Sequence, residues 1–169
     1  MNLMRNPLVW LARFRHRKGY GIHSPFAYNL VTQVLYTPGR YYADQWLEQM
    51  FPRWQRLLHV RRLACHRLLF RLANHWQPDV VKAPARLLSQ LAYLHAGCRK
   101  AKIEACHNDI ITLTGHSGTM FVIYDLQRHR TLWHQVKNDR QTTVTFDLWD
   151  MGIAVCNPKL NRQHYIINW

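Results

Sequence analysis

The sequence has few acidic residues, few cysteines and no long apolar run. Its 169 residues include 9 Asp and Glu against 23 Lys and Arg, which gives a net charge of +14. No apolar stretch approaches the roughly 20 residues of a membrane-spanning helix, so we expect no transmembrane segment. Composition argues against intrinsic disorder, because 48% of the residues are hydrophobic and can form a packed core. A chain of this length fits one domain, with room for a helical extension.

Cysteine spacing gives no sign of a disulfide framework. Cys65, Cys98, Cys106 and Cys156 form no C-x-x-C pair, which predicts reduced thiols and a cytoplasmic location. A zinc site is the alternative for one cluster, since two histidines flank two of the cysteines as His95, Cys98, Cys106 and His107. Structural zinc sites use shorter and more regular spacings than the one between these cysteines, so we expect no metal.

The N-terminal stretch MNLMRNPLVWLARFRHRKG does not have the layout of a signal peptide. Its basic cluster follows the apolar residues instead of preceding them, and no A-x-A cleavage site is present. An alternative interpretation is a basic amphipathic segment that lies on a membrane surface.

Positive charge is concentrated in the first half of the chain. Residues 1–75 hold 12 of the basic residues and only two acids, Asp44 and Glu48, whereas residues 76–169 hold 11 and 7. This asymmetry predicts an acidic partner, with nucleic acid first and anionic lipid second. The candidate phosphate-binding residues are Arg13, Arg15, Arg17, Lys18, Arg53, Arg56, Arg67 and Arg71. A solvated face of an amphipathic helix is the alternative for the last four, which lie on one side of a predicted helix.

Residues 1–76 form a basic region in which we predict only helices. Asn6-Pro7 and Ser24-Pro25 each combine an N-cap residue with proline at the first helical position. The predicted helices are 7–18, 25–36, 42–50 and 52–76.

Residues 77–169 change to short β-like runs, which predicts an α/β region that packs as one unit with the first. The expected strands are 80–81, 102–105, 120–124, 143–148, 153–156 and 165–167, with helices at 86–95 and 131–138. Lys82-Ala83-Pro84-Ala85 is the expected turn after the first strand, and Asp150-Met151-Gly152 is the expected hairpin connection.

Three segments resemble one family. They are RHRKGYGIHSPFAYNLVTQVLY near the start, HRLLFRLANHWQPDVV in the middle, and the closing segment from Thr119, TMFVIYDLQRHRTLWHQVKNDRQTTVTFDLWDMGIAVCNPKLNRQHYIINW. In this order they cover most of the chain and resemble bacterial class I S-adenosylmethionine-dependent methyltransferase-like proteins with an HSPF-type N-terminus. The resemblance implies a Rossmann-like methyltransferase sheet preceded by helices, with S-adenosylmethionine as the cofactor.

Several positions depart from what the resemblance implies. Lys82 stands where the family has an acid, and Pro84 and Leu88 stand where it has glycines that admit the cofactor. Tens of residues of the family's pattern are absent between Cys106 and Met120, so the resemblance implies a truncated sheet. That sheet must be rearranged, or closed by a second copy in a homodimer.

Two acids remain as candidate cofactor-binding residues. Glu104 is placed by the resemblance where a carboxylate accepts the ribose hydroxyls. Asp125 follows the strand 120–124 and could face the mouth of the sheet, although a helix-capping role is the favoured interpretation.

Three functions follow as hypotheses. The first is a pseudoenzyme, a divergent methyltransferase-like protein whose S-adenosylmethionine binding is lost or weakened. The second is an active S-adenosylmethionine-dependent methyltransferase with an altered pocket built on Glu104 and Asp125. The third is a non-enzymatic basic module that binds nucleic acid through the N-terminal half.

Overall fold

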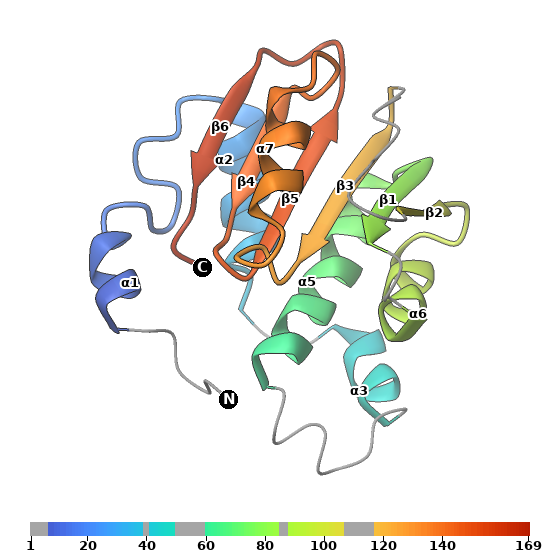
Figure 1. Ribbon diagram of the computed structural model, residues 1–169. Helices are drawn as coiled ribbons and strands as arrows, with labels where there is room; N and C mark the ends of the chain where they lie inside the picture. The colour runs from blue at the N-terminus through green and yellow to red at the C-terminus, as the bar shows by residue number, and fades with distance from the viewer. Residues whose placement is uncertain (1–6, 39–40, 50–59, 85–87, 107–116) are drawn as a thin grey trace. The chain divides into compact units, whose positions relative to one another are not determined.

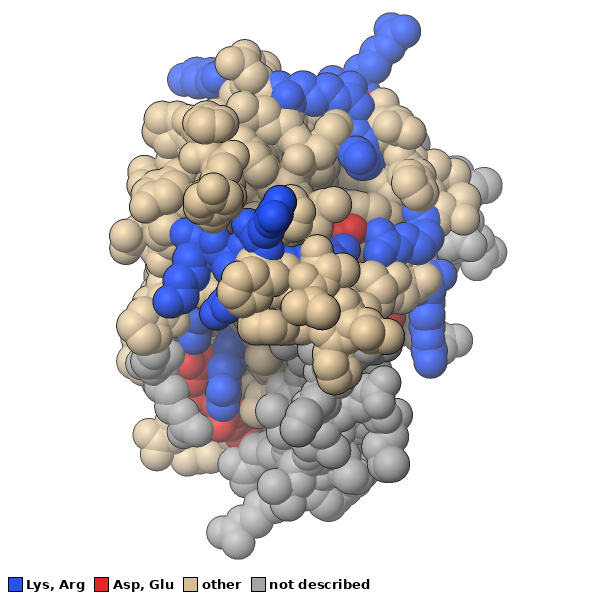
Figure 2. Space-filling model, turned by 90° about the vertical axis from the view of Figure 1, so that its left-hand side faces the viewer, with Lys and Arg blue, Asp and Glu red and all other residues tan. Residues whose placement is uncertain are grey.

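The computed structural model (Figure 1) describes residues 7–38, 41–49, 60–84, 88–106 and 117–169. Contacts divide the chain into two compact units. We call them the helical unit, which comprises Met1–Gln77, Ser89–Arg99 and Asn168–Trp169, and the sheet unit, which comprises Pro78–Leu88 and Lys100–Ile167. Lysine and arginine side chains recur over the face drawn in Figure 2 and carboxylates are few there, in keeping with the net charge.

The sheet unit contains a six-stranded mixed sheet with the strand order β2-β1-β3-β5-β4-β6. Its strands are β1 Val80–Pro84, β2 Lys102–Cys106, β3 Thr119–Tyr124, β4 Val144–Asp147, β5 Met151–Cys156 and β6 Gln163–Ile166. Only β5 runs antiparallel to its neighbours. The predicted α/β class is therefore confirmed, and the mixed sheet with its helices is compatible with a Rossmann-like fold.

The sheet is continuous at the place where the resemblance implied missing strands. β3 pairs directly with β1, in the register Val80↔Thr119 to Lys82↔Phe121. This pairing leaves no gap between β1 and β3 in the sheet. β3 then continues beyond the pairing to Tyr124, where it is paired on its other side with β5.

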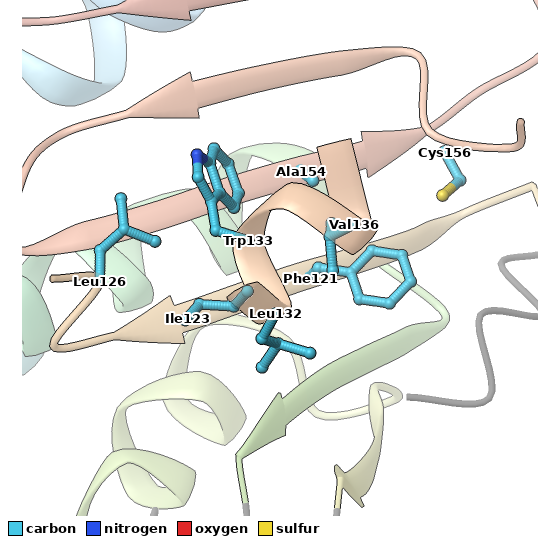
Figure 3. Packing of buried hydrophobic residues seen from close by; sticks show 8 residues of the cluster. All are labelled: Phe121, Ile123, Leu126, Leu132, Trp133, Val136, Ala154 and Cys156. Atoms are coloured by element: carbon cyan, nitrogen blue, oxygen red, sulfur yellow. The ribbon is translucent and has the colours of Figure 1, made fainter. Parts of the chain in front are cut away.

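One helix, α7 Arg130–Asn138, packs on the sheet (Figure 3). Leu132, Trp133 and Val136 are its buried residues, and their spacing places them on one face of the helix. They meet apolar side chains of β3, of β5 and of the turn after β3 in a cluster of buried residues, namely Phe121, Ile123, Leu126, Leu132, Trp133, Val136, Ala154 and Cys156. Burial raises the pKa of the Cys156 thiol to about 11, so the thiol stays protonated at neutral pH.

Strand β1 is longer than predicted, and the expected turn at Lys82 to Ala85 is wrong. Lys82, Ala83 and Pro84 belong to β1 and pair with Glu104, Ala105 and Cys106 of β2. The reason is steric, because a residue before proline disfavours the helical region and takes an extended conformation. Helix α6 is Leu88–Gly97, and residues 85–87 before it lie outside the described ranges.

The helical unit holds α1 Pro7–Ala12, α2 Pro25–Leu30, the π-helix η1 Val31–Leu35, α3 Tyr42–Gln49, α5 Val60–Trp76 and most of α6. Ser24 caps α2 as predicted, since its hydroxyl accepts the Ala27 N–H at 3.4 Å. The helix expected at 25–36 changes to π-type bonding at Val31. The helix expected at 7–18 ends at Ala12 and continues as tight turns, in which Phe14 N–H donates to Leu11 and His16 N–H to Arg13.

Helices α5 and α6 approach each other closely at Gly97. A Cβ built at this position would lie 2.4 Å from the Phe70 carbonyl oxygen and 2.9 Å from the Ala73 Cβ. Only glycine leaves room for this contact. Among the described residues, no helix combines the length and the apolar character needed to cross a membrane.

Candidate functional site

Lys82 and Glu104 face each other across neighbouring strands. They are register partners in β1 and β2, and the Lys82 Nζ lies 3.3 Å from the Glu104 Oε2. The lysine side chain is 7% exposed and the glutamate side chain 55%. Burial of an ammonium group is costly unless a carboxylate accompanies it, so the pair explains how a lysine is accommodated inside this sheet.

The face of the sheet on which this pair lies follows from the register. Lys82 is also the register partner of Phe121, which belongs to the cluster under α7. The side chains of register partners on adjacent strands point to the same face of the sheet. Lys82 and Glu104 therefore lie on the face that α7 covers over β3 and β5. Glu104 is two residues short of the end of β2, and its carboxylate has a partner within the chain.

Asp125 lies immediately after β3, at the carboxyl edge of the sheet. It is exposed, has a left-handed backbone with φ of 48°, and its carbonyl oxygen accepts the Arg128 N–H at 2.8 Å. The residue at the N-cap of α7 is His129, so the favoured capping role of Asp125 is wrong. Asp125 instead begins the turn that separates β3 from the helix.

The sheet does not bring the two predicted cofactor-binding residues together. Glu104 and Asp125 lie two strands apart, which is about 10 Å across the sheet, and four residues apart in register, which adds about 13 Å along it. They could contact only different ends of one extended ligand.

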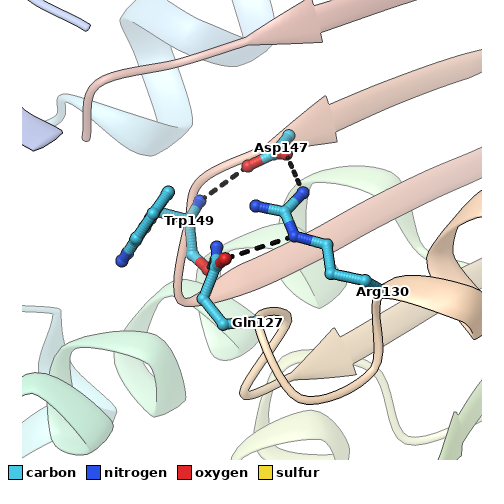
Figure 4. Close-up of polar contacts among 4 residues, drawn as sticks. All are labelled: Gln127, Arg130, Asp147 and Trp149. Carbon is cyan, nitrogen blue, oxygen red and sulfur yellow. Dashed lines mark hydrogen bonds and ion pairs between the residues drawn. The ribbon is translucent and has the colours of Figure 1, made fainter. Parts of the chain in front are cut away.

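A polar network at the same edge was not predicted (Figure 4). Arg130, at the start of α7, donates from Nη1 to Asp147 Oδ2 at 2.9 Å and from Nε to Gln127 Oε1 at 3.2 Å. The other oxygen of Asp147 accepts the Trp149 N–H at 2.9 Å, and Gln127 Nε2 donates to the Trp149 carbonyl at 3.0 Å. Trp149 has a φ of 75°, which is rare for a bulky residue.

This network is structural: it joins the start of α7 to the hairpin between β4 and β5. Both carboxylate oxygens of Asp147 accept hydrogen bonds, and Asp147 is only 8% exposed. The guanidinium of Arg130 lies 5.8 Å from the centre of the Trp149 ring, which adds a cation–π contact. The contacts hold the strained turn in place.

A second polar cluster, also missed, lies in the helical unit. Glu48 of α3 accepts two hydrogen bonds from Arg67 of α5, one from Nε at 2.7 Å and one from Nη2. Burial, and next the negative charge of Glu48, raises the pKa of Tyr93 to about 12, so its phenol stays protonated. The completely buried Asp44 accepts the Tyr41 N–H through Oδ2 at 3.0 Å. In the described part of the chain, its Oδ1 has no hydrogen-bond partner.

This cluster changes the interpretation of the predicted arginine stripe. Arg67 is bound by Glu48, and Arg71 donates from Nη1 to the Thr37 carbonyl at 3.2 Å while its guanidinium lies over the Tyr41 ring. Both arginines therefore have structural partners within the helical unit. Arg53 and Arg56 lie outside the described residues, as does half of the considered zinc cluster, since the Cys106 side chain and His107 are not described.

Within the described ranges, no three His, Cys, Asp or Glu side chains are arranged to hold a metal ion. Cys65, Cys98 and Cys156 are buried free thiols.

No family model, curated protein or solved structure matches this chain. The fold and the sites therefore define an α/β protein with a mixed six-stranded sheet. Its function is inferred below from the geometry of these sites.

Proposed function

We propose that the chain is a methyltransferase-like scaffold whose binding of S-adenosylmethionine is lost or weakened, so that it acts without methyl transfer. The order of its elements supports the scaffold. Two parallel strands linked through a helix are followed by the unit β3–α7–β4–β5, which matches the strand, helix and hairpin of the resemblance. β1 lies between β2 and β3, where a doubly wound sheet reverses its order and ligands usually bind.

The observation that carries the loss of binding is the Lys82–Glu104 ion pair. S-adenosylmethionine is a sulfonium cation, and a buried ammonium group beside its site repels it. The carboxylate expected to accept ribose hydroxyls lies 3.3 Å from that ammonium. A ribose would have to compete with a charged partner for Glu104, at the cost of leaving Lys82 without its carboxylate.

The path of β1 supports the same conclusion. Cofactor turns rely on glycines because a Cβ blocks close approach of the backbone to the ligand. Here the strand runs on to Pro84 and stays paired with β2 through Cys106. The residues that would form the start of a cofactor turn are thus extended strand.

Calorimetric titration of the full chain with S-adenosylmethionine and with S-adenosylhomocysteine tests the proposal. We expect no saturable heat at millimolar ligand, with circular dichroism confirming that the protein is folded. A micromolar dissociation constant that Glu104→Ala abolishes would overturn the loss of binding and favour the altered-pocket methyltransferase instead. Lys159→Ala, an exposed position of the sheet unit, is the matched control.

A further inference from the structure

We propose that residues 7–18 form a binding segment for an anionic membrane surface. Helix α1 buries none of its residues. Leu8 is 73% exposed, Leu11 66%, Phe14 49% and Trp10 40%. Single exposed apolar residues are common, but four within seven positions are a local concentration of exposed apolar side chains, which marks an interaction site.

The side chains of this segment are organised. Leu8 and Leu11 are three residues apart on the helix and so lie on one side of it. The Trp10 and Phe14 rings meet edge to face, with centroids 5.1 Å apart. The Arg17 guanidinium lies 5.3 Å from the centre of the Trp10 ring and 5.1 Å from that of Phe14. Aromatic, aliphatic and basic groups therefore share one short stretch.

Charge selects the kind of surface. Arg13, Arg15, Arg17 and Lys18 follow the apolar residues, and no Asp or Glu precedes Asp44 in the sequence. Segments with Leu, Trp and Phe beside Lys and Arg lie in the interface of membranes, where acyl chains receive the apolar side chains and anionic headgroups attract the basic ones.

Nucleic acid and a second copy of the chain fit this segment less well. Phosphates would neutralise the arginines, but a phosphate backbone offers nothing that removes Leu8 and Leu11 from water. A second copy could cover the leucines, but it would bring two basic segments together, and neither contains an acid. An anionic lipid surface satisfies both halves of the segment.

The helical unit holds the segment by its backbone. The Asn168 N–H donates to the His16 carbonyl at 2.7 Å, and the Asn168 Nδ2 donates to the Trp10 carbonyl at 3.2 Å. These contacts use main-chain oxygens, so they fix the segment without covering the side chains of Leu8 and Leu11. The segment is thus presented in an ordered form, which lowers the conformational cost of binding.

Co-sedimentation of the full chain with vesicles tests the inference. We expect binding to phosphatidylcholine vesicles that contain about 30% phosphatidylserine, and at least tenfold weaker binding to pure phosphatidylcholine. The double variant Leu8→Ser/Leu11→Ser should weaken binding to the anionic vesicles about tenfold or more, because it removes the apolar contribution. Arg15→Gln/Lys18→Gln should weaken it and also flatten its dependence on salt.

The control variants carry the same changes elsewhere. Ile166→Ser replaces an exposed apolar residue of the sheet unit, 46% exposed, and Lys159→Gln an exposed lysine; both should bind as the wild type does. Failure of the folded wild type to bind anionic vesicles overturns the proposal. So does vesicle binding that survives Leu8→Ser/Leu11→Ser unchanged, or binding that a single-stranded RNA competes away while the leucine variant retains RNA affinity. A dimer that the leucine variant dissociates would assign the surface to a second copy.

Discussion

At the scale of single residues, the two members of the Lys82–Glu104 pair differ in their access to water. The lysine side chain is almost completely buried, whereas more than half of the glutamate side chain is exposed. An exposed carboxylate that loses its partner is solvated by water. A buried ammonium group that loses its partner is not, and it keeps its full desolvation cost.

We therefore expect Glu104→Gln to destabilise the protein more than Lys82→Met does. The difference in the free energy of unfolding should be about 1–3 kcal/mol, the cost of leaving a buried polar group without its charged partner. The double variant Glu104→Gln/Lys82→Met should lie close to Lys82→Met, since no buried charge is left. Urea unfolding followed by circular dichroism measures all three. Equal losses from the two single changes would show that Lys82 does not depend on this carboxylate.

At the scale of the elements, sequence patterns predicted most strands but misplaced the end of β1 and the start of β5. The expected hairpin connection at 150–152 is wrong, because Met151 and Gly152 belong to β5. β3 was predictable because Gly118 and Asp125 bracket a continuous apolar run, and α7 because its buried residues recur at helical spacing. The end of β1 was not, because Pro84 was taken as a turn signal, whereas its steric effect on Ala83 extends the strand. The end of α1 at Ala12 was not predicted, because no residue there is typical of a helix C-terminus.

The polar contacts were less accessible to prediction than the elements. Arg130 and Asp147 lie 17 positions apart, and Arg67 and Glu48 lie 19 apart. Neither spacing corresponds to a helical or strand period, so only the packing of separate elements brings these side chains together. Glu104 was a candidate only through the family resemblance, and its pairing with Lys82 emerged only from the strand register.

The contact of α7 with β5 depends on the absence of a side chain at Gly152. A Cβ there would lie 2.8 Å from Leu126 Cδ1 and 2.8 Å from Cε3 and Cζ3 of the Trp133 ring. We expect Gly152→Ala to lower the free energy of unfolding by about 1–3 kcal/mol through overpacking. Thermal or urea unfolding measures the loss.

A double-mutant cycle separates overpacking from other effects of the alanine. Combined with Trp133→Leu, which removes the ring that the new methyl group would meet, Gly152→Ala should cost clearly less than it does alone. An additive result would show that the Trp133 ring does not limit the space at Gly152.

At the scale of the whole molecule, the path of the chain differs from its order in sequence. Segments 89–99 and 168–169 belong to the helical unit, although the first lies between two stretches of the sheet unit in the sequence and the second follows it. Asn168 binds the backbone of Trp10 and His16, and the Trp169 indole Nε1 donates to the Leu35 carbonyl at 2.7 Å. Residues at the far end of the sequence thus complete the packing of its first helices.

We expect Asn168→Ala and Trp169→Phe each to destabilise the helical unit by about 0.5–1.5 kcal/mol, because each removes one side-chain hydrogen bond to a main-chain oxygen. Amide hydrogen exchange should become faster in 9–16 for Asn168→Ala and in 31–36 for Trp169→Phe, while the amides of β3 and β5 keep their protection. Asn161→Ala, at an exposed position of the sheet unit, is the matched control and should leave both segments unchanged. Faster exchange spread evenly over helices and strands would contradict the assignment of residues 168–169 to the helical unit. Faster exchange confined to the named segments would support it, because each of these segments loses the hydrogen bond from residue 168 or 169.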